Sequence, residues 1–312
     1  MATPVKLPLT VRKNIRDEFE PARTMCEEKI SSILGEPWKI DFDIPSVWGY
    51  ANEASPSNSY PRESTGNMLA GYANSAVSGI SSFADKFGSD GIAELNKLVS
   101  SRSIVLESCL TQVDGTCSCE IANQKLKIIF SPGDIGVNID DAFSKLSEAV
   151  NAASKNSDSV NLPFNTRKDI KENYESRVAG IESRLAQIIG VDKVAIVVDF
   201  QAIYAALLAY HGKDNQYSLQ GFEDYLGSRT IEYLESLPSA LERDGFDKDD
   251  MLQEALQEAV STNTVSVRLV DKLERKMYNE TVIQDGKLYL QTVPKNWSVN
   301  ADQIADGIVD LL

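Results

Sequence analysis

The chain contains a near-copy of its own N-terminal segment. Residues 5–35 align without a gap on residues 160–190, and ten of the 31 positions are identical, whereas average composition would give about two by chance. The match resumes near the end of each half, where residues 137–140 correspond to residues 299–302. We therefore predict a tandem duplication of a domain of roughly 150 residues, each copy long enough to bury its own core.

The repeat also predicts the domain boundaries. We expect residues 1–150 to form the first repeat domain and residues 160–312 the second, with residues 151–159 as a polar linker rich in serine and asparagine. Two copies of one fold commonly pack as an isologous pair, so we expect a pseudo-twofold arrangement.

Each copy begins with the pattern of a long helix. Apolar residues recur every three or four positions over residues 15–33 and residues 170–188, which is typical of a helix with one buried face. Gly35 and Gly190 follow these runs, and we expect both to end their helix in the left-handed conformation. Pro21 is expected to interrupt the first helix alone, because the second copy has serine there.

The rest of each copy predicts an α+β fold. A short strand is expected at residues 38–43 and 194–199, followed by helices, a β-meander of three strands, and a closing helix at residues 138–150 and 300–312. The strands are too few and too clustered for alternating βα units.

Composition limits the classes of partner. The formal net charge of −15 disfavours binding to nucleic acid or to an anionic membrane surface, since both need a basic surface. No segment approaches the ~20 apolar residues of a membrane span, and no secretory signal is evident. All four cysteines lie in the first copy, which suits a reducing compartment better than a disulfide framework. We expect a cytoplasmic protein.

Several catalytic motifs are absent from the sequence. His211 is the only histidine, so metal sites with two histidines cannot form, and its place before Gly212 suits a cation at a helix end. Neither of the common glycine-rich phosphate loops occurs. No cofactor is indicated. The acidic turn around Asp249 lacks the spacing of a calcium loop, and a helix cap is the preferred interpretation.

The aromatic residues suggest a binding site in the first copy. Trp38, Trp48, Tyr50, Tyr60 and Tyr72 crowd this half, with no equivalent crowd in the second. Most are expected in the core, but the asymmetry favours an aromatic-lined pocket in the first repeat or in the groove between the repeats. The preferred hypothesis is a non-catalytic binding protein for a small apolar or aromatic ligand.

Paired basic residues recur at the start of both long helices. Arg12-Lys13 and Arg167-Lys168 occupy equivalent positions, where cations oppose the helix dipole. An anionic ligand would offset this cost and make these residues an anion-binding site. An internal ion pair with a residue such as Glu20 or Glu175 is the simpler alternative.

Two other classes of function stay open. Asp41 and Asp43 at the end of the first strand could serve a carboxylate-based enzyme, with or without a divalent metal, although Asp43 and its counterpart Asp199 also suit helix caps. A structural or protein-interaction subunit is the third class. The cysteines of the predicted meander are interpreted as buried thiols rather than a redox pair.

Overall fold

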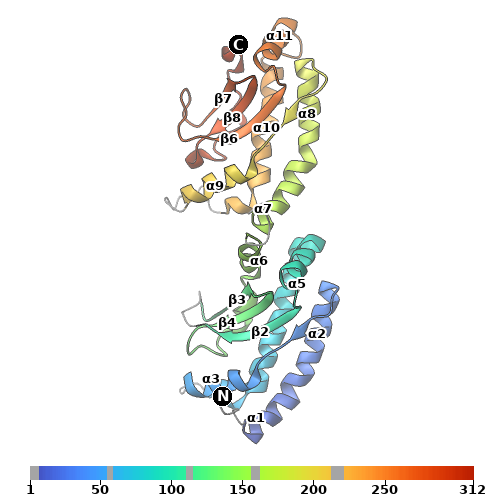
Figure 1. Ribbon diagram of the computed structural model, residues 1–312, viewed down its shortest axis with the longest axis vertical. Helices are drawn as coiled ribbons and strands as arrows, with labels where there is room; N and C mark the ends of the chain where they lie inside the picture. Colours follow the sequence, from blue (N-terminus) through green and yellow to red (C-terminus); the bar gives the residue numbers. More distant parts are fainter. Residues whose placement is uncertain (1–6, 55–58, 110–114, 156–161, 212–220) are drawn as a thin grey trace. The chain divides into compact units, whose positions relative to one another are not determined.

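The computed structural model describes five stretches of the chain (Figure 1): residues 7–54, 59–109, 115–155, 162–211 and 221–312. The chain divides into two units, Met1–Ser159 and Val160–Leu312. The structure defines the fold within each unit and not the placement of one unit against the other. The pseudo-twofold arrangement therefore stays a prediction. No helix in the described stretches is both long and apolar enough to cross a membrane.

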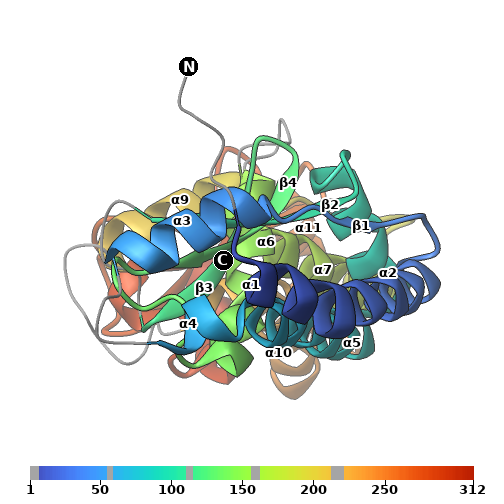
Figure 2. The same cartoon turned by 90° about the horizontal axis from the view of Figure 1, so that it is seen from below.

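The first unit mixes helices with one small sheet. Its elements are α1 (Leu9–Asn14), the π-helix η1 (Ile15–Phe19), α2 (Glu20–Leu34), β1 (Lys39–Ile40), α3 (Ile44–Ala54), α4 (Tyr60–Glu63), α5 (Thr65–Leu98), β2 (Ser103–Ser108), β3 (Cys117–Ala122), β4 (Lys125–Phe130), the 3₁₀-helix η2 (Ile139–Phe143) and α6 (Leu146–Lys155). The long helices α2 and α5 lie side by side (Figures 1 and 2).

The second unit has a closely similar order of elements. These are α7 (Phe164–Asp169), the π-helix η3 (Ile170–Glu175), α8 (Ser176–Ile189), β5 (Ala195–Ile196), α9 (Phe200–His211), η5 (Phe222–Asp224), α10 (Leu226–Arg243), α11 (Asp250–Ala259), β6 (Thr264–Leu269), β7 (Asn279–Gln284), β8 (Lys287–Thr292), and the 3₁₀-helices η6 (Pro294–Asn296), η7 (Ala301–Gln303) and η8 (Ile308–Leu311).

Both sheets have four strands and the same topology. Their orders are β1-β2-β4-β3 and β5-β6-β8-β7. In the first sheet β2 pairs in parallel with both β1 and β4, and only β3 and β4 are antiparallel; the second sheet repeats this. The prediction of an α+β fold is confirmed, but the β-meander is wrong. The last strand inserts between its two predecessors, because alternation of apolar residues fixes which face is buried and not which strands are neighbours.

The long first helix contains a π-helical segment in both units. Residues 15–19 and 170–175 form these segments, so Pro21 is not the cause of the interruption. Gly35 and Gly190 end the helices with φ of 71° and 75°, which confirms the predicted left-handed caps.

The π segments lie where a second helix crosses very closely. A Cβ atom on Gly66 would lie 2.3 Å from the carbonyl oxygen of Asn14. The Asn14 side chain accepts a hydrogen bond of 2.6 Å from the Gly66 N–H, so it satisfies a donor at the start of α5. In the second unit, Asp169 accepts a hydrogen bond of 2.5 Å from the Gly227 N–H.

The ends of the two units differ from the sequence expectation. Residues 138–150 form a 3₁₀ turn and the first part of α6, which continues to Lys155. The first five residues of the predicted linker are therefore helical, and residues 156–159 lie outside the described stretches. At the end of the second unit, 3₁₀ turns replace the expected helix. Both predicted first strands shorten to two residues.

Candidate functional site

Two of the five predicted ligand-binding aromatics are core residues. Trp38 is 2% exposed, and its Nε1 donates a hydrogen bond of 3.0 Å to Asn96 Oδ1. Tyr72 is fully buried, and its hydroxyl accepts a hydrogen bond of 3.1 Å from the Gly136 N–H. Burial raises the pKa of Tyr72 well above its usual value. These two side chains have structural partners within the fold and do not border any cavity that we describe.

The other three aromatics lie nearer the surface. Trp48 is half-buried and its Nε1 donates to the Arg62 carbonyl oxygen at 3.3 Å. The half-buried Tyr50 hydroxyl accepts from the Gly133 N–H at 3.1 Å, whereas Tyr60 is exposed. The structure places them on α3 and α4, outside the cavities that we describe.

The predicted anion-binding residues have different surroundings in the two units. Arg12 and Lys13 are exposed on α1. Lys168 pairs with Glu172, one helical turn along the chain, so an internal ion pair is present, though not with Glu175. Arg167 lines a cavity of about 650 Å³ in the second unit, together with apolar side chains such as Val197.

The strand-end aspartates act as helix caps. Asp43 accepts hydrogen bonds from the backbone N–H and the hydroxyl of Ser46 at 3.2 and 2.7 Å. Asp199 accepts from the Ala202 N–H at 2.9 Å. This confirms the capping interpretation, and Asp41 lies exposed nearby. Across the described stretches, no three histidine, cysteine, aspartate or glutamate residues are grouped so that they could hold a metal ion.

The acidic turn of the second unit is also a cap. Asp249 accepts hydrogen bonds from the N–H groups of Met251 and Leu252 at 3.0 and 3.3 Å, at the start of α11. This confirms the interpretation of the turn as a helix cap, since the carboxylate satisfies donors that the helix leaves open.

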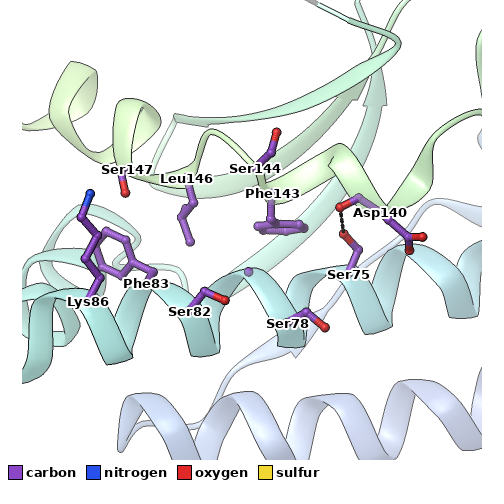
Figure 3. Close-up of a pocket in the computed structure, with 11 residues that line it drawn as sticks. Ser75, Ser78, Ser82, Phe83, Lys86, Asp140, Phe143, Ser144, Leu146 and Ser147 are labelled. Atoms are coloured by element: carbon purple, nitrogen blue, oxygen red, sulfur yellow. Dashed lines mark hydrogen bonds between the residues drawn. The ribbon is translucent and has the colours of Figure 1, made fainter.

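A groove in the first unit is the best candidate site. It has a volume of about 420 Å³ and runs between α5 and the η2–α6 segment (Figure 3). We call it the serine groove; its lining residues are Ser75, Ser78, Gly79, Ser82, Phe83, Lys86, Asp140, Phe143, Ser144, Leu146 and Ser147. Sequence reasoning missed this groove because its two walls lie some 60 positions apart in the chain. The only signal in the sequence is the spacing of the small residues at 75, 78, 79 and 82, which places them on one face of a helix.

The base of the serine groove is apolar and tightly packed. Phe83, Phe143 and Leu146 are each at most 4% exposed. A Cβ atom on Gly79 would lie 2.2 Å from the Cβ of Phe143, so only glycine allows this close approach. The groove therefore has a rigid floor beneath its polar rim.

The rim of the serine groove carries hydroxyls and one cation. Ser75 donates to the Asp140 carbonyl oxygen at 3.5 Å. Ser78 and Ser82 make no side-chain hydrogen bond within the described part of the chain. Lys86 places its Nζ 4.8 Å from the Phe87 ring centroid, and no carboxylate among the described residues lies within ion-pair distance of it. Hydroxyl and ammonium groups are thus available to a ligand.

The second unit has a groove at the equivalent place. Its volume is about 500 Å³, and we call it the acidic groove; its lining residues are Glu232, Glu235, Ser236, Ser239, Ala240, Arg243, Ser298, Asn300, Ala301 and Asp302. Ser236 and Ser239 stand 161 positions after Ser75 and Ser78, as Tyr233 stands after Tyr72. The groove is therefore a feature that both units share.

An ion pair distinguishes the two grooves. Arg243 Nη2 lies 2.7 Å from Asp306 Oδ1, which links α10 to the segment opposite. The corresponding residues of the first unit are Ser82 and Ser144, which are too short to meet in this way. The serine groove therefore has no bridge at this point.

Comparison with known proteins gives no match. No family model, curated protein or solved structure matches the chain. Function is therefore inferred from the residues and their geometry alone.

The thiols give a test of burial in the first unit. Cys26, Cys117 and Cys119 are buried and Cys109 is half-buried, and none forms a disulfide. Burial raises the pKa of Cys117 to about 11 and that of Cys119 to about 12, so their thiolate fraction near neutral pH falls at least about a hundredfold. We expect iodoacetamide to label Cys109 first in the native chain, as peptide mass spectrometry would show. Equal labelling of all four before unfolding would contradict this burial.

Proposed function

We propose that this chain is a non-catalytic binding protein that holds a small molecule in the serine groove of its first unit. The observation that carries the proposal is the unbridged groove, which has an apolar floor and a rim of hydroxyls. Its volume of about 420 Å³ lies within the range of about 300–1,000 Å³ typical of ligand pockets. In the second unit, Arg243 lines the equivalent groove and is held in an ion pair with Asp306.

The comparison between the grooves depends on a common origin of the two units, which we also propose. Besides sheet topology, equivalent side chains make equivalent contacts. Glu27 accepts from the Ile40 N–H at 2.9 Å, and Glu182 accepts from the Ile196 N–H at 2.8 Å. Such matched contacts between a helix and the following strand are expected of a duplicated domain and not of two unrelated ones.

A second matched contact lies beside the grooves themselves. The Tyr233 hydroxyl accepts a hydrogen bond of 2.8 Å from the Ser298 N–H, as Tyr72 accepts one from Gly136. Asn138 and Asn300 share the left-handed conformation, both with φ of 49°. These contacts support equivalent walls beside both grooves, which differ in side chains such as Ser82 and Arg243.

The test transfers the bridge from the second unit to the first. We expect the double variant Ser82→Arg/Ser144→Asp to stay folded, because the second unit tolerates this pair at the equivalent positions. Native mass spectrometry of the full chain, as purified, measures the occupancy of any co-purified small molecule. We expect occupancy to fall by about tenfold, because the new ion pair would cross the groove.

The matched control is Arg243→Ser/Asp306→Ser, which removes the bridge from the acidic groove and should leave that occupancy unchanged. Circular dichroism shows whether each variant keeps its fold. Unchanged occupancy in a folded Ser82→Arg/Ser144→Asp chain would refute the proposal. A stoichiometric metal that is lost in Asp43→Ala would instead support the carboxylate enzyme.

We also propose the cytoplasm as the location of the chain. The four cysteines are all free thiols, and three of them are buried, which is the ordinary state in a reducing compartment. Measuring the thiol state in cells with a rapid alkylating quench tests this, and a disulfide found there would oppose it.

A further inference from the structure

The serine groove and the acidic groove differ in how their charges are compensated. In the acidic groove, Arg243 pairs with Asp306, and Glu232 and Glu235 pair with arginines of α10 and α8. In the serine groove, Lys86 has no carboxylate partner among the described residues. The first unit therefore presents an unpaired cation at the rim of its groove, whereas Arg243, the cation that lines the acidic groove, is paired.

The charged groups of the serine groove lie at opposite ends. Figure 3 shows Lys86 beside Ser147 at one end and Asp140 beside Ser75 at the other. Lys86 and Ser75 are eleven residues apart on α5, a separation of about 16 Å at the helical rise. An elongated ligand therefore meets a cation at one end and a carboxylate at the other. Coulombic attraction favours an anionic group at Lys86.

The surface between these ends suits a ligand with several hydroxyls. Ser78 and Ser82 project from successive turns of α5, and Ser144 and Ser147 come from the segment opposite (Figure 3). Each serine hydroxyl can donate one hydrogen bond and accept two. The apolar floor beneath them suits the C–H face of a ring. Ser144 already donates to the Asp141 carbonyl oxygen at 2.8 Å, but a neutral apolar ligand would leave the hydroxyls of Ser78 and Ser82 without partners, at a cost in affinity.

We infer that the ligand of the serine groove is a small polyhydroxylated anion, such as a sugar acid or a sugar phosphate, with its charged group at Lys86. This inference rests on the proposed function and adds the chemical class of the ligand. The Lys86 ammonium pairs with the carboxylate or phosphate, and the serine hydroxyls exchange hydrogen bonds with those of the ligand. Asp140 at the far end opposes a second anionic group, so the ligand binds in one orientation.

Calorimetric titration of the full chain with four named probes tests this inference. The probes are D-glucuronate, D-glucose 6-phosphate, neutral D-glucose and cationic D-glucosamine. We expect the two anions to bind at least about tenfold more tightly than glucose, and glucosamine to bind most weakly. The advantage of the anions should shrink at high salt, because screening weakens exposed charge pairs. The stronger of the two anions distinguishes a carboxylate from a phosphate ligand.

The variant Lys86→Gln isolates the charge. It should reduce binding of the anions to the level of glucose and leave glucose unchanged. Lys29→Gln is the matched control, because it removes the same charge from an exposed position on α2, away from the groove, and should leave the binding of all four probes unchanged. Equal affinity for glucose and glucuronate, or an unchanged anion affinity in Lys86→Gln, would overturn the inference and leave the groove as a binding site. If none of the four probes binds, the inference about the ligand class is overturned. The proposed function is tested separately, by the occupancy of the Ser82→Arg/Ser144→Asp variant.

Discussion

Replacing Gly66 with alanine is expected to lower the free energy of unfolding of the first unit by about 3 kcal/mol, the upper part of the usual range for overpacking. The added Cβ would lie 2.3 Å from the carbonyl oxygen of Asn14 and 2.8 Å from the backbone nitrogen of Ile15. These are main-chain atoms, so no side chain can rotate to relieve the overlap. The α1–η1 segment and α5 must separate, and the hydrogen bond from the Gly66 N–H to Asn14 lengthens with them.

Urea unfolding measures the change, and the chain offers two comparisons. Gly227→Ala should have a similar effect in the second unit, because its Cβ would lie 2.6 Å from the Ile170 Cα atom. Gly180→Ala should raise stability by about 0.5–1 kcal/mol, as is usual for glycine in a helix, since nothing lies within 4 Å of a Cβ there. A Gly66→Ala chain as stable as Gly180→Ala would show that the helices do not cross this closely.

Replacing Glu280 with glutamine is expected to lower the free energy of unfolding of the second unit by about 2–3 kcal/mol at neutral pH, the scale for hydrogen bonds to a charged group. Glu280 is 1% exposed. Its carboxylate accepts from the Arg275 and Glu274 N–H groups at 2.8 and 3.2 Å and from Gln291 Nε2 at 2.7 Å. A glutamine amide has one acceptor oxygen fewer, and its NH₂ group would face a backbone donor.

The effect should depend on pH in a defined direction. Burial by itself raises the pKa of Glu280, but hydrogen bonds from the Arg275 backbone, Gln291 and the Glu274 backbone together lower it below its usual value. A lowered folded-state pKa contributes stability that is fully present above the unfolded value of about 4.3 and is lost as the pH falls through the folded value. The difference between the wild type and Glu280→Gln should therefore shrink at acidic pH.

Urea unfolding at neutral and acidic pH measures this difference, and Glu254→Gln on exposed α11 serves as the control because its carboxylate is in solvent. The control should change stability by less than about 0.5 kcal/mol, as is usual for surface substitutions. The difference in free energy of unfolding between the wild type and Glu280→Gln could instead stay constant down to low pH. That result would show that the Glu280 carboxylate has an ordinary pKa in the folded chain.

Local features of the fold could be predicted from sequence. The long apolar stripe of residues 15–33 indicates a helix, and Gly35 marks its end, because helix periodicity and a left-handed cap depend on neighbours only a few positions away. The caps by Asp43 and Asp199 follow from the same local chemistry. The match of residues 5–35 with residues 160–190 pointed to two similar units, because aligning two short segments needs no knowledge of long-range contacts.

Long-range pairing escaped sequence reasoning. Alternation in residues 264–269 correctly indicated a strand, but it holds no information on which strand lies alongside, and the predicted meander was wrong for that reason. The roles of Trp38 and Tyr72 were also underdetermined, because composition cannot distinguish an aromatic ring that fills the core from one that borders a pocket. Their hydrogen bonds are made to residues more than 50 positions away in the chain, Asn96 on α5 for Trp38 and Gly136 in a turn for Tyr72.

The candidate site shows the same division. The sequence by itself determined the small residues on one face of α5, the serines at 144 and 147, and the lysine at 86. Only the tertiary structure decided that these two segments face each other across an apolar floor, and that Ser82 and Ser144 correspond to an ion pair in the second unit. A groove is made by the packing of distant segments, and the side chains that form it carry no mark of each other in the linear order of the chain.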